Sequence, residues 1–439
     1  MEFNLEQQNN ISKLFNEMNS KQDFLTLLNF TKQILYGIKS IPFEEKQLNY
    51  YINKEVINGS RVFYTSFPIN KKSGGERIIH APVKGLKEFQ KVLNLIFQCV
   101  YTPHKSATGF VLGKSIVDNA KVHVNQNYVY NLDLKDFFPS IDKSRVWGRL
   151  LVAPFNLGNS PERKKIANMI AILSCTPMEV ERCIDGEWQT KSISVLPQGA
   201  PTSPSLTNAI CEKLDIRLNG VAKRFGLNYS RYADDITFSS NQNSHTNKKG
   251  DAETIYTSDS SFNEEVRRII SEQNFHIKES KVRLQKRGYR QEVTGVIVNE
   301  KINVNQKYIK QLRQWIFFWE SYGYERANLY FLKSYIAAKG HVKKGKPSLI
   351  NVIDGKLLYL KMIKGDDDTT YSKLKERFDA LCVINSPINS ILDTWEKEGI
   401  EKAMELYYSN NGKQSSDISN LEIEQEILDI NKILITKIL

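Results

Sequence analysis

The sequence lacks the features that define several large classes of protein. Its five cysteines are scattered through 439 residues with no C-x-x-C pair, which argues against a zinc ribbon or a disulfide framework and favours a reducing compartment. No apolar run reaches the roughly 18 residues that a membrane span requires. The first residues are polar, which is untypical of a signal peptide. We therefore expect a cytoplasmic protein with no membrane partner.

Basic residues outnumber acidic ones. The chain has 61 lysines and arginines against 49 aspartates and glutamates, which gives a formal net charge of +12. Such a surface attracts polyanions and speeds encounter with nucleic acid, although many unrelated proteins share this charge. The length is typical of two or three domains.

Two adjacent carboxylates, Asp234 and Asp235, stand between two β-rich runs. Like charges at contact distance resist joint ionisation, and a divalent cation removes that penalty. Mg²⁺ prefers hard oxygen ligands and keeps positions open for substrate phosphates. The pattern therefore predicts a metal-dependent site for phosphoryl transfer, although an Asp-Asp pair alone is common in surface turns.

A third carboxylate, Asp133, lies about a hundred residues earlier, in a run (128–134) that predicts a strand leading to a turn at Pro139. If the two strands are neighbours, the three carboxylates can hold two metal ions about 3.5–4 Å apart and stabilise both oxygens of an in-line displacement. Asp136 is an alternative fourth ligand, but we expect a solvated turn residue there.

Between these segments, residues 196–208 contain Gly199 and three prolines, which predict an irregular backbone that leads into a helix. Pro204 is the expected first helical residue, with Ser203 as its cap. A rigid floor of small residues suits a flat base pair, and an ordinary loop before a helix is the alternative.

In this order and spacing the three segments resemble the palm of reverse transcriptases. Asp133 matches the first catalytic aspartate, Leu196-Pro197-Gln198-Gly199 the template-contacting motif, and Tyr232-Ala233-Asp234-Asp235 the second metal motif. The resemblance implies an RNA-directed DNA polymerase that uses dNTPs and two Mg²⁺ ions. Asp133 and Asp234 would hold the ions, Asp235 would support them, and the Leu134 carbonyl would add one ligand.

The resemblance extends in both directions along the chain. Residues 72–79 are similar to the fingers hairpin, which implies that Lys72 and Arg77 bind the incoming triphosphate. Residues 275–281 are similar to the fourth palm motif, which implies Lys281 as the proton donor to pyrophosphate. The resemblance also implies that Phe138 is a steric gate against the ribose 2′-hydroxyl, with core packing as the alternative. It implies that Gln198 contacts the template base and that Tyr232 contacts the primer end.

Two shorter segments resemble signatures of retron reverse transcriptases. Asn119 and His123 precede the first catalytic strand, and Val293-Thr294-Gly295 follows the fourth motif. The resemblance implies that a structured non-coding RNA is both template and primer, that the product is an RNA–DNA hybrid used in anti-phage defence, and that an effector protein from the same operon is a possible partner. It also implies RNA contacts for Asn119 and His123. Without the family, this pair is an i, i+4 contact on a helix.

The predicted fold class is α+β, a right-hand polymerase fold with an antiparallel palm sheet, a helical thumb, and helical extensions at both ends. We expect an N-terminal helical region at 1–50, fingers at 51–125, a palm at 126–300, a thumb at 301–386 and a C-terminal helical extension at 387–439. Within the palm, residues 239–260 are almost wholly polar and are predicted to be a disordered insertion.

Basic residues in the predicted thumb are candidates for RNA contact. Lys307, Lys310 and Arg313 fall largely off the apolar stripe of a helix predicted at 306–322, where they either follow a phosphate backbone or are simply solvated. Lys343 and Lys344 belong to the densest positive cluster, which is either an RNA contact or a plain loop.

Two alternatives to the retron interpretation stay open. One is another defence-associated or group II intron-like reverse transcriptase that primes differently. The other is a catalytically silent scaffold that only binds RNA, which the three intact carboxylates disfavour.

Overall fold

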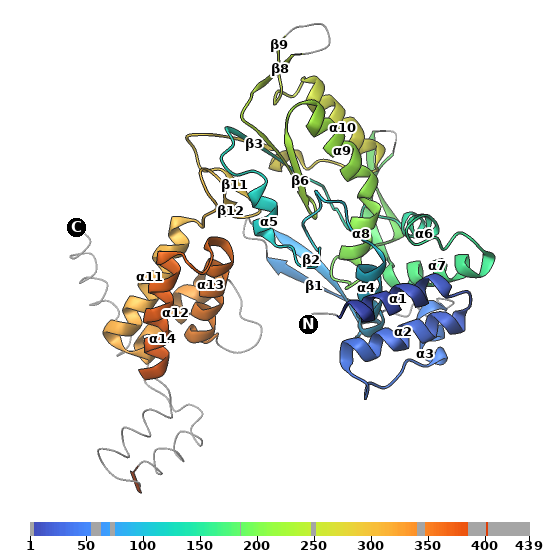
Figure 1. Ribbon diagram of the computed structural model, residues 1–439, viewed down its shortest axis with the longest axis horizontal. Helices are drawn as coiled ribbons and strands as arrows, with labels where there is room; N and C mark the ends of the chain where they lie inside the picture. The colour runs from blue at the N-terminus through green and yellow to red at the C-terminus, as the bar shows by residue number, and fades with distance from the viewer. Residues whose placement is uncertain are drawn as a thin grey trace. The chain divides into compact units, whose positions relative to one another are not determined.

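The structure is a computed structural model that describes residues 4–53, 63–70, 75–184, 186–246, 252–339, 347–384 and 401–402. The chain divides into two units, Met1–Ile302 and Asn303–Leu439. Both helices and strands form the first unit, whereas the described part of the second is helical (Figure 1). No helix in the described ranges is long and apolar enough to cross a membrane.

The N-terminal region is helical, as predicted, and consists of α1 (Leu5–Glu17), α2 (Lys21–Tyr36) and α3 (Glu45–Ile52). A capping box between Ser20 and Asp23 begins α2 by satisfying two backbone N–H groups. The apolar stripes of α1 and α2 pack against α4 (Lys84–Val100). Figure 1 shows this cluster beside the start of the chain.

A four-stranded antiparallel sheet forms the centre of the first unit. Its strand order is β10–β3–β7–β6, with bounds Arg283–Lys286, Tyr128–Asp133, Asp235–Ser240 and Asn228–Tyr232. α9 (Glu212–Arg224) and α10 (Ser261–Glu272) pack against each other, and α9 also packs on β6. The register places Asp133 directly opposite Asp235, so β3 and β7 are neighbours, as the sequence analysis required.

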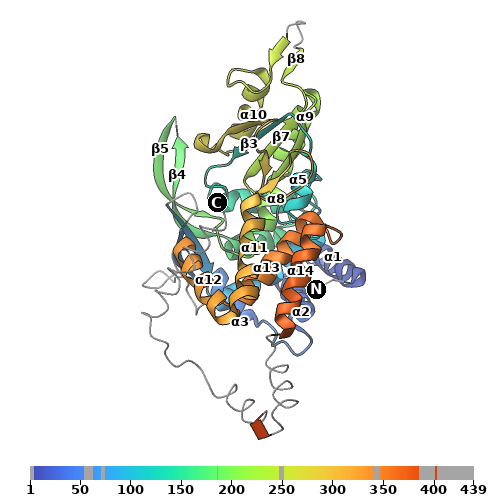
Figure 2. The same cartoon turned by 90° about the vertical axis from the view of Figure 1, so that its left-hand side faces the viewer.

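Short two-stranded hairpins surround this sheet. They are β1 (Tyr64–Asn70) with β2 (Glu76–Pro82), β4 (Thr176–Ile184) with β5 (Glu187–Val195), β8 (Ser244–Thr246) with β9 (Ala252–Thr254), and β11 (Glu292–Val293) with β12 (Val296–Ile297). The β4–β5 hairpin stands beside the sheet in Figure 2.

The prediction that residues 239–260 are disordered is wrong for the described part of this segment. Its first two residues complete β7, and β8 and β9 then pair as a hairpin. Ile255 and Tyr256 are buried, and the Tyr256 hydroxyl lies 2.7 Å from the Ser240 hydroxyl. Two apolar side chains thus anchor a segment whose average composition is polar.

The remaining helices of the first unit are α5 (Ile116–Lys121), α6 (Lys143–Leu151), α7 (Pro161–Ser174) and α8 (Ser203–Ile210), with a 3₁₀ turn η1 (Glu279–Lys281). The predicted start of α8 is wrong by one residue. Thr202 is the N-cap, and Pro204 is the second helical residue. Proline is tolerated in this first turn, because its missing N–H has no helical partner there.

In residues 303–339 and 347–384 of the second unit, four helices pack together: α11 (Gln306–Tyr322), α12 (Tyr324–Lys339), α13 (Leu349–Lys364) and α14 (Thr369–Ile384). The predicted stripe on α11 is buried at Leu312, Ile316 and Trp319. Of the other α11 aromatics, Trp315 and Phe318 also pack in this core, while Phe317 is exposed. Outside the described residues lie Lys343, Lys344 and, apart from 401–402, the extension predicted at 387–439.

Candidate active site

Three carboxylates lie at one end of the central sheet. Asp133 ends β3 and Asp235 begins β7, and directly opposed residues of antiparallel strands have Cα atoms about 4.5–5.5 Å apart. Asp234 lies in the turn between β6 and β7, where its carbonyl accepts a 3.1 Å hydrogen bond from the Leu134 amide. Tertiary pairing thus joins carboxylates that are a hundred residues apart in the chain.

A buried ion pair supports this turn from inside. Arg231 binds both carboxylate oxygens of Asp215 at 2.7 Å and donates to the Ala233 carbonyl at 3.1 Å. Tyr229 donates a third bond to Asp215, and the Arg231 and Asp215 side chains have no exposed surface. Burial disfavours the charged guanidinium, but the charge of Asp215 raises the Arg231 pKa overall, so the arginine stays ionised. Ala233 has a left-handed φ of 57°, which this network holds in place.

The carboxylates carry charge that the protein compensates only in part. Burial raises the pKa of Asp235 to about 6, and the charges of Asp234 and Asp133 add to the shift. Burial and the charge of Asp133 likewise raise the pKa of Asp234. Lys281 and Arg77 act in the opposite direction on Asp234, so the fingers-like hairpin β1–β2 brings a positive charge to the acidic turn. A cation at this position relieves the repulsion.

Lys281 neutralises one carboxylate directly. Its Nζ atom lies 2.5 Å from Oδ2 of Asp133, and the Lys278 amide donates to the Asp133 carbonyl at 2.8 Å. These contacts dock residues 276–281 onto the end of β3. An ammonium group therefore already holds the Asp133 carboxylate.

The donor set suits a hard divalent cation in its chemistry. Three carboxylates and the Leu134 carbonyl offer oxygen ligands, and the pKa values of Asp234 and Asp235 are raised by burial first and by the neighbouring negative charges second. Within the described ranges, no three His, Cys, Asp or Glu side chains already stand in a metal-ligating arrangement. In this structure Oδ2 of Asp133 is paired with Lys281.

Residues 196–199 are fixed to strand β2 of the β1–β2 hairpin. The Gln198 carbonyl accepts a 2.8 Å hydrogen bond from the His80 amide of β2. At Gly199, φ is 127°, and a Cβ atom would stand 2.7 Å from the His80 carbonyl oxygen, so only glycine fits. Arg77 is exposed on the same strand β2, whereas Lys72 lies outside the described residues.

Tyr232 ends β6 directly before the acidic turn, and Phe138 lies five residues after Asp133; both side chains are half-buried. The Phe138 ring lies 5.5 Å from that of Phe137, which in turn contacts Phe275 in the core. A third ring, Phe110, lies 6.1 Å from Phe138 and 6.3 Å from Tyr232. The sequence analysis missed Phe110, because its loop carries no pattern that points to the site.

The side chains of Asn119 and His123, for which RNA contacts are predicted, are both fully buried. His123 follows the end of α5, so the pair is not an i, i+4 helical pair, and its ring nitrogens each lie 2.7 Å from a serine hydroxyl, Ser239 and Ser230. Asn119 contacts Thr294 at 3.4 Å, so the two retron-like segments meet in space. In this structure both side chains make contacts within the fold.

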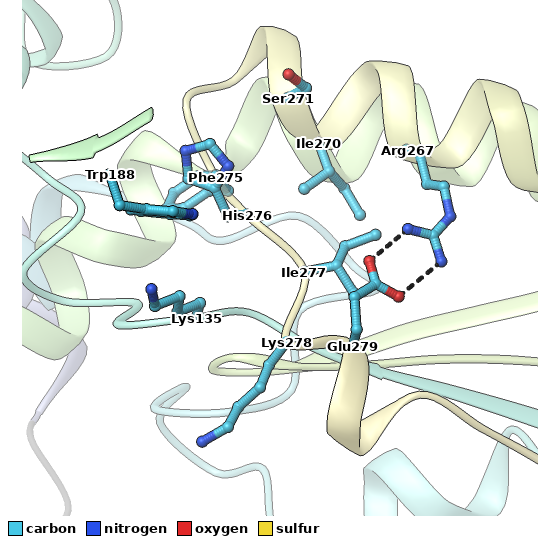
Figure 3. Close-up of a pocket in the computed structure, with 10 residues that line it drawn as sticks. All are labelled: Lys135, Trp188, Arg267, Ile270, Ser271, Phe275, His276, Ile277, Lys278 and Glu279. Carbon is cyan, nitrogen blue, oxygen red and sulfur yellow. Dashed lines mark hydrogen bonds and ion pairs between the residues drawn. The ribbon is translucent and has the colours of Figure 1, made fainter. Parts of the chain in front are cut away.

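A pocket of about 480 Å³ adjoins the catalytic strand (Figure 3). It lies between the β4–β5 hairpin and the segment from α10 to η1, and Lys135 connects it to the site through its amide, which donates to the His276 carbonyl at 2.7 Å. The Lys135 ammonium lies 3.6 Å from the Trp188 ring centre and 2.7 Å from Glu181. The remaining lining includes the ion pair between Arg267 and Glu279 and the side chain of Lys278. Its apolar part comes from Ile270, Phe275 and Ile277.

Comparison with known proteins assigns the family. Residues 69–308, more than half of the chain, match the family described as reverse transcriptase (RNA-dependent DNA polymerase). The chain therefore belongs to the reverse transcriptase family, and the predicted right-hand polymerase fold is confirmed. A reverse transcriptase domain implies dependence on a divalent metal in general.

Among curated proteins the chain is similar to retron reverse transcriptases. It is 37% identical over 254 residues to the Mx65 enzyme of Myxococcus xanthus, a match that covers 57% of this chain and 54% of the relative. The Mx162 enzyme of the same organism is 36% identical over 242 residues, 54% of this chain and 47% of the relative. The Ec86 enzyme of Escherichia coli is 29% identical over 255 residues, 57% of this chain and 68% of the relative. The predicted resemblance to the retron type is confirmed, and the chain spans about half the length of the two M. xanthus relatives.

Proposed function

We propose that the protein is an RNA-directed DNA polymerase of the retron type, which copies part of a structured non-coding RNA into DNA. The observation that carries this proposal is the direct pairing of Asp133 with Asp235 beside Asp234, within a chain of the reverse transcriptase family. In this proposal the partner RNA is both template and primer, the product is an RNA–DNA hybrid, and the system defends a bacterial cell against phage from the cytoplasm, with an effector protein from the same operon.

Each side chain at the site has a part in nucleotidyl transfer. Asp133, Asp234 and the Leu134 carbonyl would hold two Mg²⁺ ions, with Asp235 in support. When bound, such ions activate the primer hydroxyl and neutralise charge on the phosphates. Lys281, released from Asp133, delivers a proton to the leaving pyrophosphate.

Other residues orient the substrates. Arg77 and Lys72 bind the incoming triphosphate. Arg77 belongs to β2, the strand whose His80 amide is hydrogen-bonded to the Gln198 carbonyl. Gln198 contacts the template base, and Tyr232 the primer end. Phe138 excludes a ribose 2′-hydroxyl, which favours DNA synthesis over RNA synthesis.

We assign residues 51–125 to fingers, 126–300 to a palm and 301–386 to a thumb. In the thumb, the exposed side chains of Lys307, Lys310 and Arg313 follow the RNA backbone. Lys343 and Lys344 belong to the same proposal by charge alone.

Purification of the protein with its bound nucleic acid, followed by addition of Mg²⁺ and dNTPs, tests the proposal. We expect a short DNA joined to RNA through a 2′–5′ linkage. The double variant Asp234→Asn with Asp235→Asn should carry RNA without DNA, because it loses the metal ligands. Asp136→Asn is the matched control, since Asp136 is exposed three residues after Asp133 and its φ of 45° suits asparagine.

The other outcomes separate the alternatives. DNA that begins at a 3′ end, with no 2′–5′ linkage, would favour a group II intron-like or other defence-associated enzyme. RNA without DNA in the unaltered protein would favour the non-catalytic scaffold.

A further inference from the structure

Phe110 combines an exposed ring with a strained backbone at the edge of the acidic turn. It lies in the loop between α4 and α5, where its side chain is 41% exposed and its φ is 61°. A left-handed backbone is unfavourable for a bulky residue, because Cβ approaches the following carbonyl. The structure maintains this conformation at a residue whose ring contributes little to the core.

The surrounding loop is fixed to β6 immediately before the acidic turn. The Thr108 amide donates to the Arg231 carbonyl at 2.9 Å, and the Asn208 side chain donates to the Gly109 carbonyl at 2.9 Å. At Gly109, a Cβ atom would stand 2.6 Å from the Ala233 amide nitrogen, so the two backbones are in direct contact. The position of Phe110 is therefore set by the same strand that presents Asp234.

The Phe110 ring connects two side chains that have separate proposed roles. Its centre is 6.1 Å from Phe138, at the steric-gate position, and 6.3 Å from Tyr232, at the primer end. Phe110 also lines a cavity of about 170 Å³, together with Val111 and Leu112 of the same loop. The ring thus spans the boundary between incoming nucleotide and primer without being held by dense packing.

We propose that Phe110 is a positioning residue that sets the sugar specificity of the polymerase. It holds the Phe138 ring against the deoxyribose of an incoming deoxynucleoside triphosphate and forms the wall between that sugar and the primer end. The inference rests on the proposed polymerase function. It explains why phenylalanine stands where glycine would fit the backbone without strain.

Single-nucleotide incorporation by the whole protein on a defined primer and template tests this role. Phe110→Gly should raise KM for the dNTP and lower the preference for dNTP over rNTP, each between about threefold and tenfold, which is the worth of one aromatic contact. Because glycine relieves the left-handed backbone, the melting temperature should not fall. Phe110→Tyr should restore the wild-type KM and sugar preference.

A control within the same loop separates a positioning role from loop damage. Leu112 is 60% exposed and makes no ring contact with Phe138 or Tyr232, so Leu112→Ala should leave KM and sugar preference unchanged. Equal values for Phe110→Gly and wild type, or equal changes in Phe110→Gly and Leu112→Ala, would overturn the inference and leave the polymerase function intact. An inactive wild-type protein would instead refute the polymerase function.

Discussion

The ion pair between Lys281 and Asp133 joins two residues with proposed roles in catalysis. The ammonium is 2.5 Å from the carboxylate, and the residue is also the proposed proton donor to pyrophosphate. A merely structural ion pair that is half-exposed contributes little to stability, about 1 kcal/mol or less. A structural ion pair therefore predicts little change in the rate of the chemical step when Lys281 is replaced, whereas a proton donor predicts a large decrease.

Replacement of Lys281 by methionine should slow the chemical step by about 100-fold or more, because a positioned general acid typically contributes that much. Single-turnover incorporation at saturating dNTP measures this step. Lys278→Met is the control, since Lys278 lines the neighbouring pocket and no role in proton transfer is assigned to it. A rate for Lys281→Met within twofold of the control would contradict the role as proton donor.

His123 predicts a pH dependence of stability. Burial lowers its pKa from 6.5 to about 3, so the folded protein keeps the ring neutral between two serine hydroxyls. Above pH 6.5 this contribution is complete, because neither state binds the proton. Below that pH the unfolded chain binds a proton that the folded protein refuses, and stability falls by about 1.4 kcal/mol per pH unit.

At pH 5, His123 should therefore cost the wild type about 2 kcal/mol of unfolding free energy relative to pH 7. His123→Gln keeps hydrogen-bonding capacity but cannot titrate, so its stability should fall less over the same interval. Denaturant unfolding of both proteins at pH 7 and pH 5 gives the loss of unfolding free energy in each. The part of this loss that comes from carboxylates is common to both proteins and cancels when the two losses are compared. Parallel losses in the two proteins would contradict the prediction.

At the scale of elements, the Asp215–Arg231 pair joins α9 to β6 beneath the acidic turn. Both side chains are fully buried, so the charge of each must be compensated by the charge of the other. Removal of one partner of a buried pair leaves an uncompensated charge, whereas replacement of both by apolar residues is often tolerated. Because Arg231 also donates to the Ala233 carbonyl, its contributions to stability and to activity can be separated.

Asp215→Asn should lower the unfolding free energy by about 3–5 kcal/mol. The double variant Asp215→Leu with Arg231→Met should recover most of that stability, but it should remain impaired in DNA synthesis because the turn loses its support. Chemical denaturation and primer extension measure the two effects. A double variant that is stable and fully active would mean that the ion pair does not position the turn.

The loop 104–110 shows why the fit of one element on another depends on single glycines. Ala107 forms a parallel β-bridge with Arg231, and the Gly109 backbone is then in direct contact with Ala233 of the acidic turn. An element with no regular secondary structure thus completes the edge of the site. Periodicity analysis does not detect such segments, since they have no period.

At the scale of the whole molecule, the net charge of +12 predicts salt-sensitive binding of RNA. Each phosphate contact releases condensed counterions, so affinity falls as salt rises. The side chains of Lys307, Lys310 and Arg313 project from α11 as an exposed basic group.

Replacement of these three residues by glutamine should weaken RNA binding and reduce the slope of log K against log salt by about 2–3. Filter binding of the partner RNA between 50 and 200 mM salt, the range over which such contacts weaken, measures the slope. A control with the same loss of charge changes exposed lysines of α1 and α7, namely Lys13, Lys164 and Lys165. Equal slopes for the two triple variants would mean that α11 binds through bulk charge only.

The sequence by itself determined the family, and it predicted the chemistry that we propose. Asp133, the 234–235 pair and Gln198 lie in short motifs defined by residue type and local order, so the pattern alone pointed to them. The N-terminal helices followed from apolar periodicity, which is also local.

Only the tertiary structure decided what those motifs touch. It buried Asn119 and His123, brought Asn119 to Thr294, paired Arg231 with Asp215, and placed Phe110 beside Phe138. It also ordered part of the polar segment 239–260 through Ile255 and Tyr256. The physical reason is that burial and pairing depend on partners far away in the chain, which no local pattern specifies.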